Sequence, residues 1–217
     1  MNPHPADVSE ARALAELVLL ETGNDDERAP DPVIVAGALG ILMLEVPSIR
    51  LAGARGLTTW AQGGYVIEVD ENLSESARQS VAAHELGHVC CRLWNITPHD
   101  WERFAWIFSA AMLVRADVAA DLWRERSSFP HLIAQLPHVP PTSIALALGE
   151  HGIADVAVTQ WKSIRYTRAR APVPEETIRA GIAAARSGAA RRGSVRAWRL
   201  DDMPGRAAVV VDARLAG

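Results

Sequence analysis

The chain has 217 residues, of which 49% are hydrophobic and 22% are charged. These are globular values, which allow one core of ordinary size plus a small appendage and exclude a disordered or fibrous chain. The formal net charge is −4, and the two cysteines are adjacent at positions 90 and 91, which excludes a disulfide framework and favours a reducing, cytoplasmic location.

Residues 1–30 are expected to form an N-terminal amphipathic helix followed by an acidic linker. Asp7 and Glu10 have the spacing of a capping box, and Gly23 is placed to end the helix. The N-terminus lacks a basic start followed by an apolar stretch, so we expect no signal peptide.

Residues 31–126 are expected to form the core, with an apolar helix over Val33 to Ala38. Three strand candidates follow, at Ile41 to Val46, Leu57 to Ala61 and Tyr65 to Val69. Gly63-Gly64 suits a hairpin turn. No apolar run is long enough to span a bilayer, so no membrane partner is expected. The pattern predicts an α+β fold, mainly helical, with a small antiparallel β-meander packed on the next helix.

The stretch His84-Glu85-Leu86-Gly87-His88 carries the strongest functional signal in the sequence. A helix is predicted here, with Ser74 as its N-cap. In a helix, two histidines four residues apart lie on one face and can reach one metal ion. Glu85 lies beside that ion, where it can take a proton from a metal-bound water, and a side chain at Gly87 could crowd the metal. This is the H-E-x-x-H arrangement of zinc peptidases; the alternative is two histidines hydrogen-bonded in an ordinary amphipathic helix.

A peptidase zinc needs a third protein ligand and a fourth position left to water. A histidine six residues after the second is excluded, because Trp94 stands there. A second helix is expected after Pro98, with Asp100 as N-cap and Glu102 in the first turn. Small side chains that would let this helix approach the first lie at Ala105, Ser109 and Ala110. Glu102 is therefore the favoured third ligand, and its alternative role is an interaction with the helix dipole. Competing ligands nearby are His99, Asp100 and Cys91.

With these residues in view, the chain resembles the ImmA/IrrE family of metallopeptidases over residues 31 to 115. The family's Ala-His-Glu-Leu-Gly-His core matches Ala83 to His88, and its next helix, E-x-x-A-N-x-F-A-A-x-L-L-M-P, matches Glu102 to Arg115. Its Leu-Gly-Ile helix end matches Leu39 to Ile41. The resemblance implies that Zn²⁺, or alternatively Mn²⁺, is held by three side chains and that Glu85 is the catalytic base. The implied metal ligands are His84, His88 and Glu102.

Two positions depart from the family pattern. The family's Asn, four residues after the ligand glutamate, is Trp106 here. In related peptidases this position often accepts a hydrogen bond from a ligand histidine, which an indole cannot do because it only donates. Another acceptor must then serve, or metal affinity falls. The family's closing Pro is Arg115, so the helix is expected to run on toward Asp117.

Residues 127–171 are expected to form a helical, possibly helix-turn-helix-like segment. Four prolines break residues 127–141 into short helical pieces. Residues 142–165 suggest two short helices around a turn at Gly149 to Ile153, the spacing of a helix-turn-helix unit. A plain helical subdomain is favoured over a DNA-reading one.

Residues 172–217 are expected to hold a basic helix over Glu175 to Arg186 and a hairpin. The hairpin pairs Val195–Leu200 with Arg206–Asp212 across Met203-Pro204-Gly205. Residues 160–217 contain 12 basic and 5 acidic side chains, a net of +7, against −11 for the remainder. A basic third suggests an acidic partner or nucleic acid, and a solvated arginine-rich face is the favoured alternative.

The favoured function is an intracellular zinc-dependent metallo-endopeptidase. The resemblance implies a protein substrate, a helix-turn-helix transcriptional repressor whose cleavage derepresses mobile-element or stress-response genes. The group that stabilises the oxyanion is not evident, and the candidates by residue type are Tyr65, His131 and His138. One alternative is a DNA- or protein-binding regulator with a structural or vestigial zinc site. Another is a small-peptide or amide hydrolase that uses the same metal chemistry.

Overall fold

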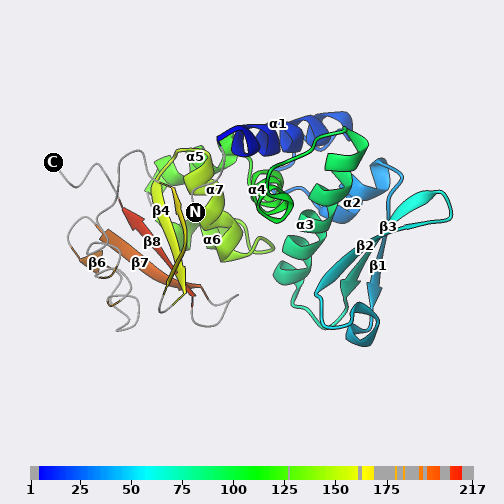
Figure 1. Cartoon of the computed structure of the whole chain (residues 1–217). Helices are drawn as coiled ribbons and strands as arrows, with labels where there is room; N and C mark the ends of the chain where they lie inside the picture. The colour runs from blue at the N-terminus through cyan, green and yellow to red at the C-terminus, as the bar shows by residue number, and fades with distance from the viewer. Residues whose placement is uncertain are drawn as a thin grey trace.

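The computed structural model describes residues 5–126, 128–160, 163–168, 179, 183, 191–192, 195–200 and 206–211. These residues form an α+β fold in which a helical body separates two sheets (Figure 1). The helices are α1 (Pro5–Glu21), α2 (Pro32–Ala38), α3 (Glu75–Leu93), α4 (Trp101–Leu113), α5 (Ala116–Arg126), α6 (Phe129–Gln135) and α7 (Pro141–Glu150). No helix in this described part is long and apolar enough to cross a membrane.

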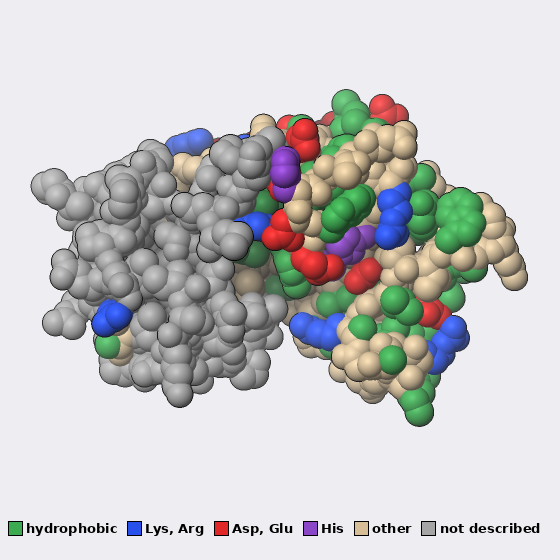
Figure 2. Space-filling view, in the orientation of Figure 1, with side chains coloured by type: hydrophobic (Ala, Val, Ile, Leu, Met, Phe, Trp, Pro, Cys, Tyr) green, Lys and Arg blue, Asp and Glu red, His purple; other side chains and the backbone are tan. Residues whose placement is uncertain are grey.

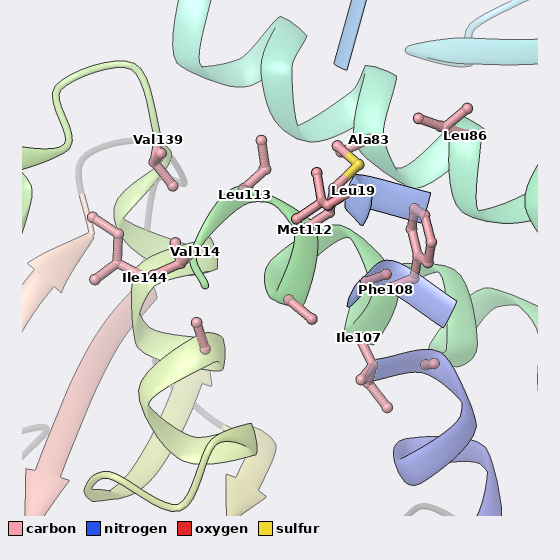
Figure 3. Packing of buried hydrophobic residues seen from close by; sticks show 14 of the residues in the cluster. Leu19, Ala83, Leu86, Ile107, Phe108, Met112, Leu113, Val114, Val139 and Ile144 are labelled. Atoms are coloured by element: carbon pink, nitrogen blue, oxygen red, sulfur yellow. The ribbon is translucent and has the colours of Figure 1, made fainter. Parts of the chain in front are cut away.

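Helix α4 lies at the centre of the helical body and packs against α1, α3 and α7. Nine of its 13 residues are buried, from Phe104 to Leu113. A helix that is apolar nearly all round must be enclosed by other elements, which explains its central place. Figure 3 shows Phe108 and Met112 of α4 with Leu19 of α1 and Leu86 of α3 between these helices.

The first sheet contains β1 (Leu42–Val46), β2 (Gly56–Ala61) and β3 (Gly64–Asp70), in the order β1-β3-β2. The three predicted strands are present, but the predicted antiparallel meander is wrong: β1 runs parallel to β3, and only β2 is antiparallel to it. Strand β3 takes the centre because Ile67, Glu68 and Val69 are all buried, so both of its faces are covered. After β1 the chain leaves the sheet through a 3-10 helix, Ser48–Leu51, and returns on the far side of β3.

The turn between β2 and β3 consists of Gln62 and Gly63, one residue earlier than predicted. Both have positive φ, 50° and 83°, as the two central residues of a type I′ hairpin turn require. Gly64 instead begins β3, opposite Ala61.

Two predicted helix boundaries are wrong. Helix α4 does not run on toward Asp117; it ends at Leu113, and Val114 is extended (φ −137°, ψ 96°). The Val114 carbonyl accepts a hydrogen bond from His151 Nε2 at 2.9 Å, and Arg115 pairs with Asp117, which lies in the first turn of α5. At the other end of the body, Asp7 is not an N-cap, because α1 already begins at Pro5.

The second helix predicted after residue 153 is also wrong, and with it the helix-turn-helix interpretation. The chain turns at Gly152 and enters β4 (Asp155–Gln160), which pairs with β5 (Ser163–Arg168) and β8 (Arg206–Val211). With β7 (Val195–Leu200) and β6 (Arg191–Arg192), the strand order is β5-β4-β8-β7-β6. Three of the four residues at 156–159 are β-branched, which suits a strand.

The antiparallel pairing of Val195–Leu200 with the strand that starts at Arg206 is confirmed. The helix predicted over residues 175–186 lies almost entirely outside the described residues, and the turn at 203–205 lies wholly outside them.

Candidate metal centre

Helices α3 and α4 bring the side chains of His84, His88 and Glu102 to one point. His84 Nε2 lies 3.2 Å from His88 Nε2. Each imidazole faces a different oxygen of Glu102, with His84 Nε2 3.4 Å from Oε2 and His88 Nε2 3.4 Å from Oε1. Among the residues described, these form the one group of three or more metal-binding side-chain types whose donor atoms lie within 4.8 Å of one another.

These three separations fit a tetrahedral zinc ion. Zinc–nitrogen and zinc–oxygen bonds are about 2.0–2.1 Å, so two ligands at the tetrahedral angle lie about 3.3–3.4 Å apart. The 3.2 Å between the two imidazole nitrogens is close to that value, and each nitrogen has a carboxylate oxygen of Glu102 at 3.4 Å, a different oxygen for each. Two imidazoles and one carboxylate are also a donor set that suits zinc.

The electrostatic state of His84 suits metal binding. Burial, and after it the neighbouring His88, lowers the pKa of His84 to about 3, so its ring is neutral. A neutral imidazole carries the free lone pair that a metal needs. Glu102, by contrast, has a side chain that is 74% exposed, so the donor set is open to solvent on the α4 side. Figure 2 shows histidine, acidic and basic side chains gathered on this face.

Glu85 lies beside the donor set, and a residue of the first sheet holds its carboxylate in place. Thr58 of β2 donates a hydrogen bond from Oγ1 to Glu85 Oε2 at 2.8 Å. Burial raises the pKa of Glu85, and the Thr58 hydroxyl opposes that rise without cancelling it. A raised pKa makes a carboxylate a better proton acceptor near neutral pH. Thr58 cannot be recognised from the sequence, because no local pattern marks a strand threonine as the partner of a helix glutamate 27 residues later.

Two glycines set the spacing of the elements around the site. A Cβ on Gly56 of β2 would lie 2.5 Å from Val81 Cγ1 and 2.9 Å from Glu85 Cγ, so β2 can approach α3 because this residue has no side chain. A Cβ on Gly87 would lie 3.0 Å from Phe108 Cδ1 and 3.2 Å from Ala105 Cα, both on α4. Gly87 therefore makes room for α4.

Trp106 stands where the resembled family has an acceptor for a ligand histidine. Its ring is tilted by 46° against the His84 ring, with centroids 4.4 Å apart. His84 Nδ1 is buried and has no hydrogen-bond partner among the described residues. At this position, therefore, the imidazole has a ring contact with an indole, and its Nδ1 has no acceptor among the described residues.

The competing ligands proposed from sequence have other partners. Cys91 is 1% exposed within the hydrophobic core, and burial raises the pKa of its thiol. His99 Nδ1 pairs with the buried Asp7 at 2.9 Å. The Asp100 carboxylate caps α4 by accepting a hydrogen bond from the Arg103 backbone N–H at 3.0 Å.

The candidates for oxyanion stabilisation lie elsewhere as well. His131 Nε2 pairs with Glu125 at 2.9 Å, and His138 Nδ1 pairs with Glu75, at the start of α3, at 2.8 Å. Tyr65 packs against Trp60 on the hairpin. No contact of these three with the donor set is found within the described residues.

Comparisons with known proteins cover most of the chain. Residues 38–181 match the peptidase M78 family model, described as the IrrE N-terminal-like domain. No curated protein matches. Among solved structures, a Mycobacterium tuberculosis transcriptional regulator shares the fold, with 14% identity, a TM-score of 0.53, and coverage of 94% of this chain and 88% of that one.

Proposed function

The chain belongs to the peptidase M78 family, that of the IrrE N-terminal-like domain, and from this premise we propose that it is a zinc-dependent metallo-endopeptidase. The observation that carries the proposal is the convergence of two imidazole nitrogens 3.2 Å apart with a Glu102 oxygen 3.4 Å from each, and a carboxylate of raised pKa beside them. A helix pair held together only by packing does not require two histidines and a glutamate to converge in this way.

In this proposal His84, His88 and Glu102 hold Zn²⁺, with Mn²⁺ as the alternative metal. When bound, zinc would polarise the scissile carbonyl and lower the pKa of a coordinated water toward about 7. Glu85 takes the proton of the attacking water and delivers it to the leaving amine. The Thr58 hydroxyl fixes one carboxylate oxygen of Glu85, so the other is left for the proton.

The first sheet offers a way to hold a peptide beside Glu85. Strand β2 is paired with β3 on one side only, among the described residues. An extended peptide can add to such an edge by main-chain hydrogen bonds. Because Thr58 of this strand contacts Glu85, a peptide on β2 would pass next to the proposed base.

We further propose that the substrate is a protein, a helix-turn-helix repressor whose cleavage derepresses mobile-element or stress-response genes. Family membership supports a regulatory role, and the similar fold of a protein named a transcriptional regulator agrees with it. Two free, buried thiols at Cys90 and Cys91 support action in the reducing cytoplasm.

The test separates metal binding from proton transfer. Zinc-loaded protein is incubated with helix-turn-helix repressors encoded beside its own gene, and fragments are identified by mass spectrometry. Glu85→Gln should retain zinc yet lose cleavage, whereas Glu102→Gln should lose both. Glu71→Gln, at an exposed glutamate before α3, should change neither. Undiminished cleavage by Glu85→Gln would reject this mechanism.

A second function, a binding regulator with a structural zinc site, is favoured by one observation. Among the described residues His84 Nδ1 has no hydrogen-bond partner, whereas in many metal sites such a bond tunes the ligand histidine. Binding of duplex DNA that weakens steeply with salt, in a protein that cuts no repressor, would favour this alternative.

A further inference from the structure

The tip of the β2–β3 hairpin carries an aromatic pair, in which Trp60 is exposed and Tyr65 is half-buried. Trp60, near the end of β2, is 64% exposed. It stands opposite Tyr65 in the strand register, and the two rings meet edge to face with centroids 4.7 Å apart and an interplanar angle of 80°. Tyr65 in turn packs against the hydrophobic core. The Trp60 indole therefore packs against Tyr65 on one side, while most of its surface is exposed to solvent.

The strand alternation puts this indole on the same face as the proposed base. Side chains at positions i and i+2 of a strand point to the same side. Thr58 points toward α3, because its hydroxyl bonds to Glu85. Trp60 therefore points to the α3 side as well, about 7 Å farther along β2, at about 3.4 Å per residue.

A peptide paired with β2 would present its side chains with the same alternation. The residue opposite Thr58 would lie next to Glu85, and the residue two positions away on the same face would lie next to Trp60. On this basis we propose that Trp60, backed by Tyr65, is a specificity-determining residue that binds an aromatic or large aliphatic substrate side chain two residues from the one beside Glu85. This inference rests on the proposed peptidase function.

The aromatic pair suits such a role better than a merely solvent-exposed side chain does. Single exposed apolar residues are common and need no explanation. Here, however, the indole is fixed by a neighbouring ring, so little rotamer freedom is lost when a ligand packs on it. An aromatic partner would add a further edge-to-face or stacked contact.

The test is a competition between two peptides that differ at one position. Digestion of a peptide library by the zinc-loaded full chain, read by mass spectrometry, identifies a cleaved sequence with Phe or Leu two residues from the bond, and an Ala version is made. We expect wild type to prefer the Phe or Leu peptide about tenfold in kcat/KM. Trp60→Ala should bring that ratio close to 1, and Trp60→Phe should restore most of it. Leu57→Ala, at an exposed residue on the opposite face of β2, should leave the ratio unchanged.

Binding is measured by calorimetry on zinc-loaded Glu85→Gln, with and without Trp60→Ala, for a Phe or Leu peptide and its Ala version that are chosen from the library by capture on Glu85→Gln, so that the choice needs no cleavage. A preference in binding that disappears with Trp60 supports the inference even if no variant cleaves, in which case only the peptidase proposal fails. An unchanged ratio in Trp60→Ala, an equal loss for both peptides, or the absence of any binding would overturn the inference.

Discussion

Replacing Trp106 by asparagine tests the link between the outer nitrogen of His84 and metal affinity. The structure gives His84 Nδ1 no acceptor among the described residues and places the Trp106 ring 4.4 Å from the imidazole centroid. A carbonyl oxygen in this place would accept the Nδ1–H bond and fix the tautomer that leaves Nε2 free for zinc. We expect Trp106→Asn to bind zinc more tightly.

The magnitude follows from what such a bond is worth. Hydrogen bonds to ligand histidines change metal affinity about 10- to 100-fold, which is about 1.4–2.7 kcal/mol. The cost of a buried unsatisfied donor, about 1–3 kcal/mol, is of the same size. Loss of the indole should lower the free energy of unfolding. Truncation of a fully buried tryptophan costs about 3–5 kcal/mol, and truncation of the half-buried Trp106 should cost less.

The two effects can be separated. Zinc affinity is measured by competition with a chelator of known affinity, and thermal unfolding is followed with and without zinc. The asparagine variant should be less stable than wild type without metal yet gain more stability when zinc is added. Trp106→Leu removes the indole without supplying an acceptor and should not gain affinity. Equal gains in both variants would mean that the indole merely obstructs the site, and no gain in the asparagine variant would refute the hydrogen-bond argument.

Two further predictions concern the spacing of the helices and the proposed base. Gly87→Ala places a methyl group 3.0 Å from a side-chain atom of α4, so the cost of overpacking, about 1–3 kcal/mol, should exceed the gain in helix propensity of about 1 kcal/mol. Urea unfolding should show the loss of stability. Competition with a chelator should show weaker zinc binding, because Glu102 comes from α4. The exposed Gly37, with nothing within 4 Å of its Cβ position, should instead tolerate or gain from alanine, and equal destabilisation of both variants would contradict the packing argument. Thr58→Val removes a hydrogen bond that lowers the pKa of Glu85, so this pKa should rise and the acidic limb of the pH profile of kcat/KM should move to higher pH; an unmoved limb would mean that the hydroxyl does not set the proton affinity of the base.

The convergence of His84, His88 and Glu102 could be anticipated because each part of it is encoded locally. The two histidines are four residues apart on one helix, and the Asp100 cap fixes where the next helix begins and hence where Glu102 falls. The chain between the two helices is short, so α3 and α4 are neighbours and pack closely.

The sheets were harder to predict because strand partners are distant in sequence. The positions of strands β1, β2 and β3 follow from the sequence, but their order does not. The order depends on which strand is covered on both faces, and β3 contacts both the 3-10 helix and α3. Strand β4 is an even stronger example of distant pairing, because its neighbour β8 begins only at Arg206. A short segment such as Val156–Thr159 follows an α-helix and a turn, and without knowledge of that distant partner a second helix is an equally good interpretation.

Gly87 lies inside the histidine motif, but its contacts give it a role that the motif alone does not reveal. Successive residues of an α-helix are rotated by about 100°. Taking His84 as the origin, His88 lies at about 40° and Gly87 at about −60°, so the glycine is turned well away from the direction in which both imidazoles point. That direction belongs to α4, and the close contacts of a hypothetical Cβ with Phe108 and Ala105 agree with it. A small residue between two ligand histidines is therefore best explained by the approach of the helix that carries the third donor, Glu102. If this explanation holds, a larger residue at position 87 weakens the zinc site by moving Glu102, and truncation of Phe108 should restore only part of the affinity, because the contact with the Ala105 backbone remains.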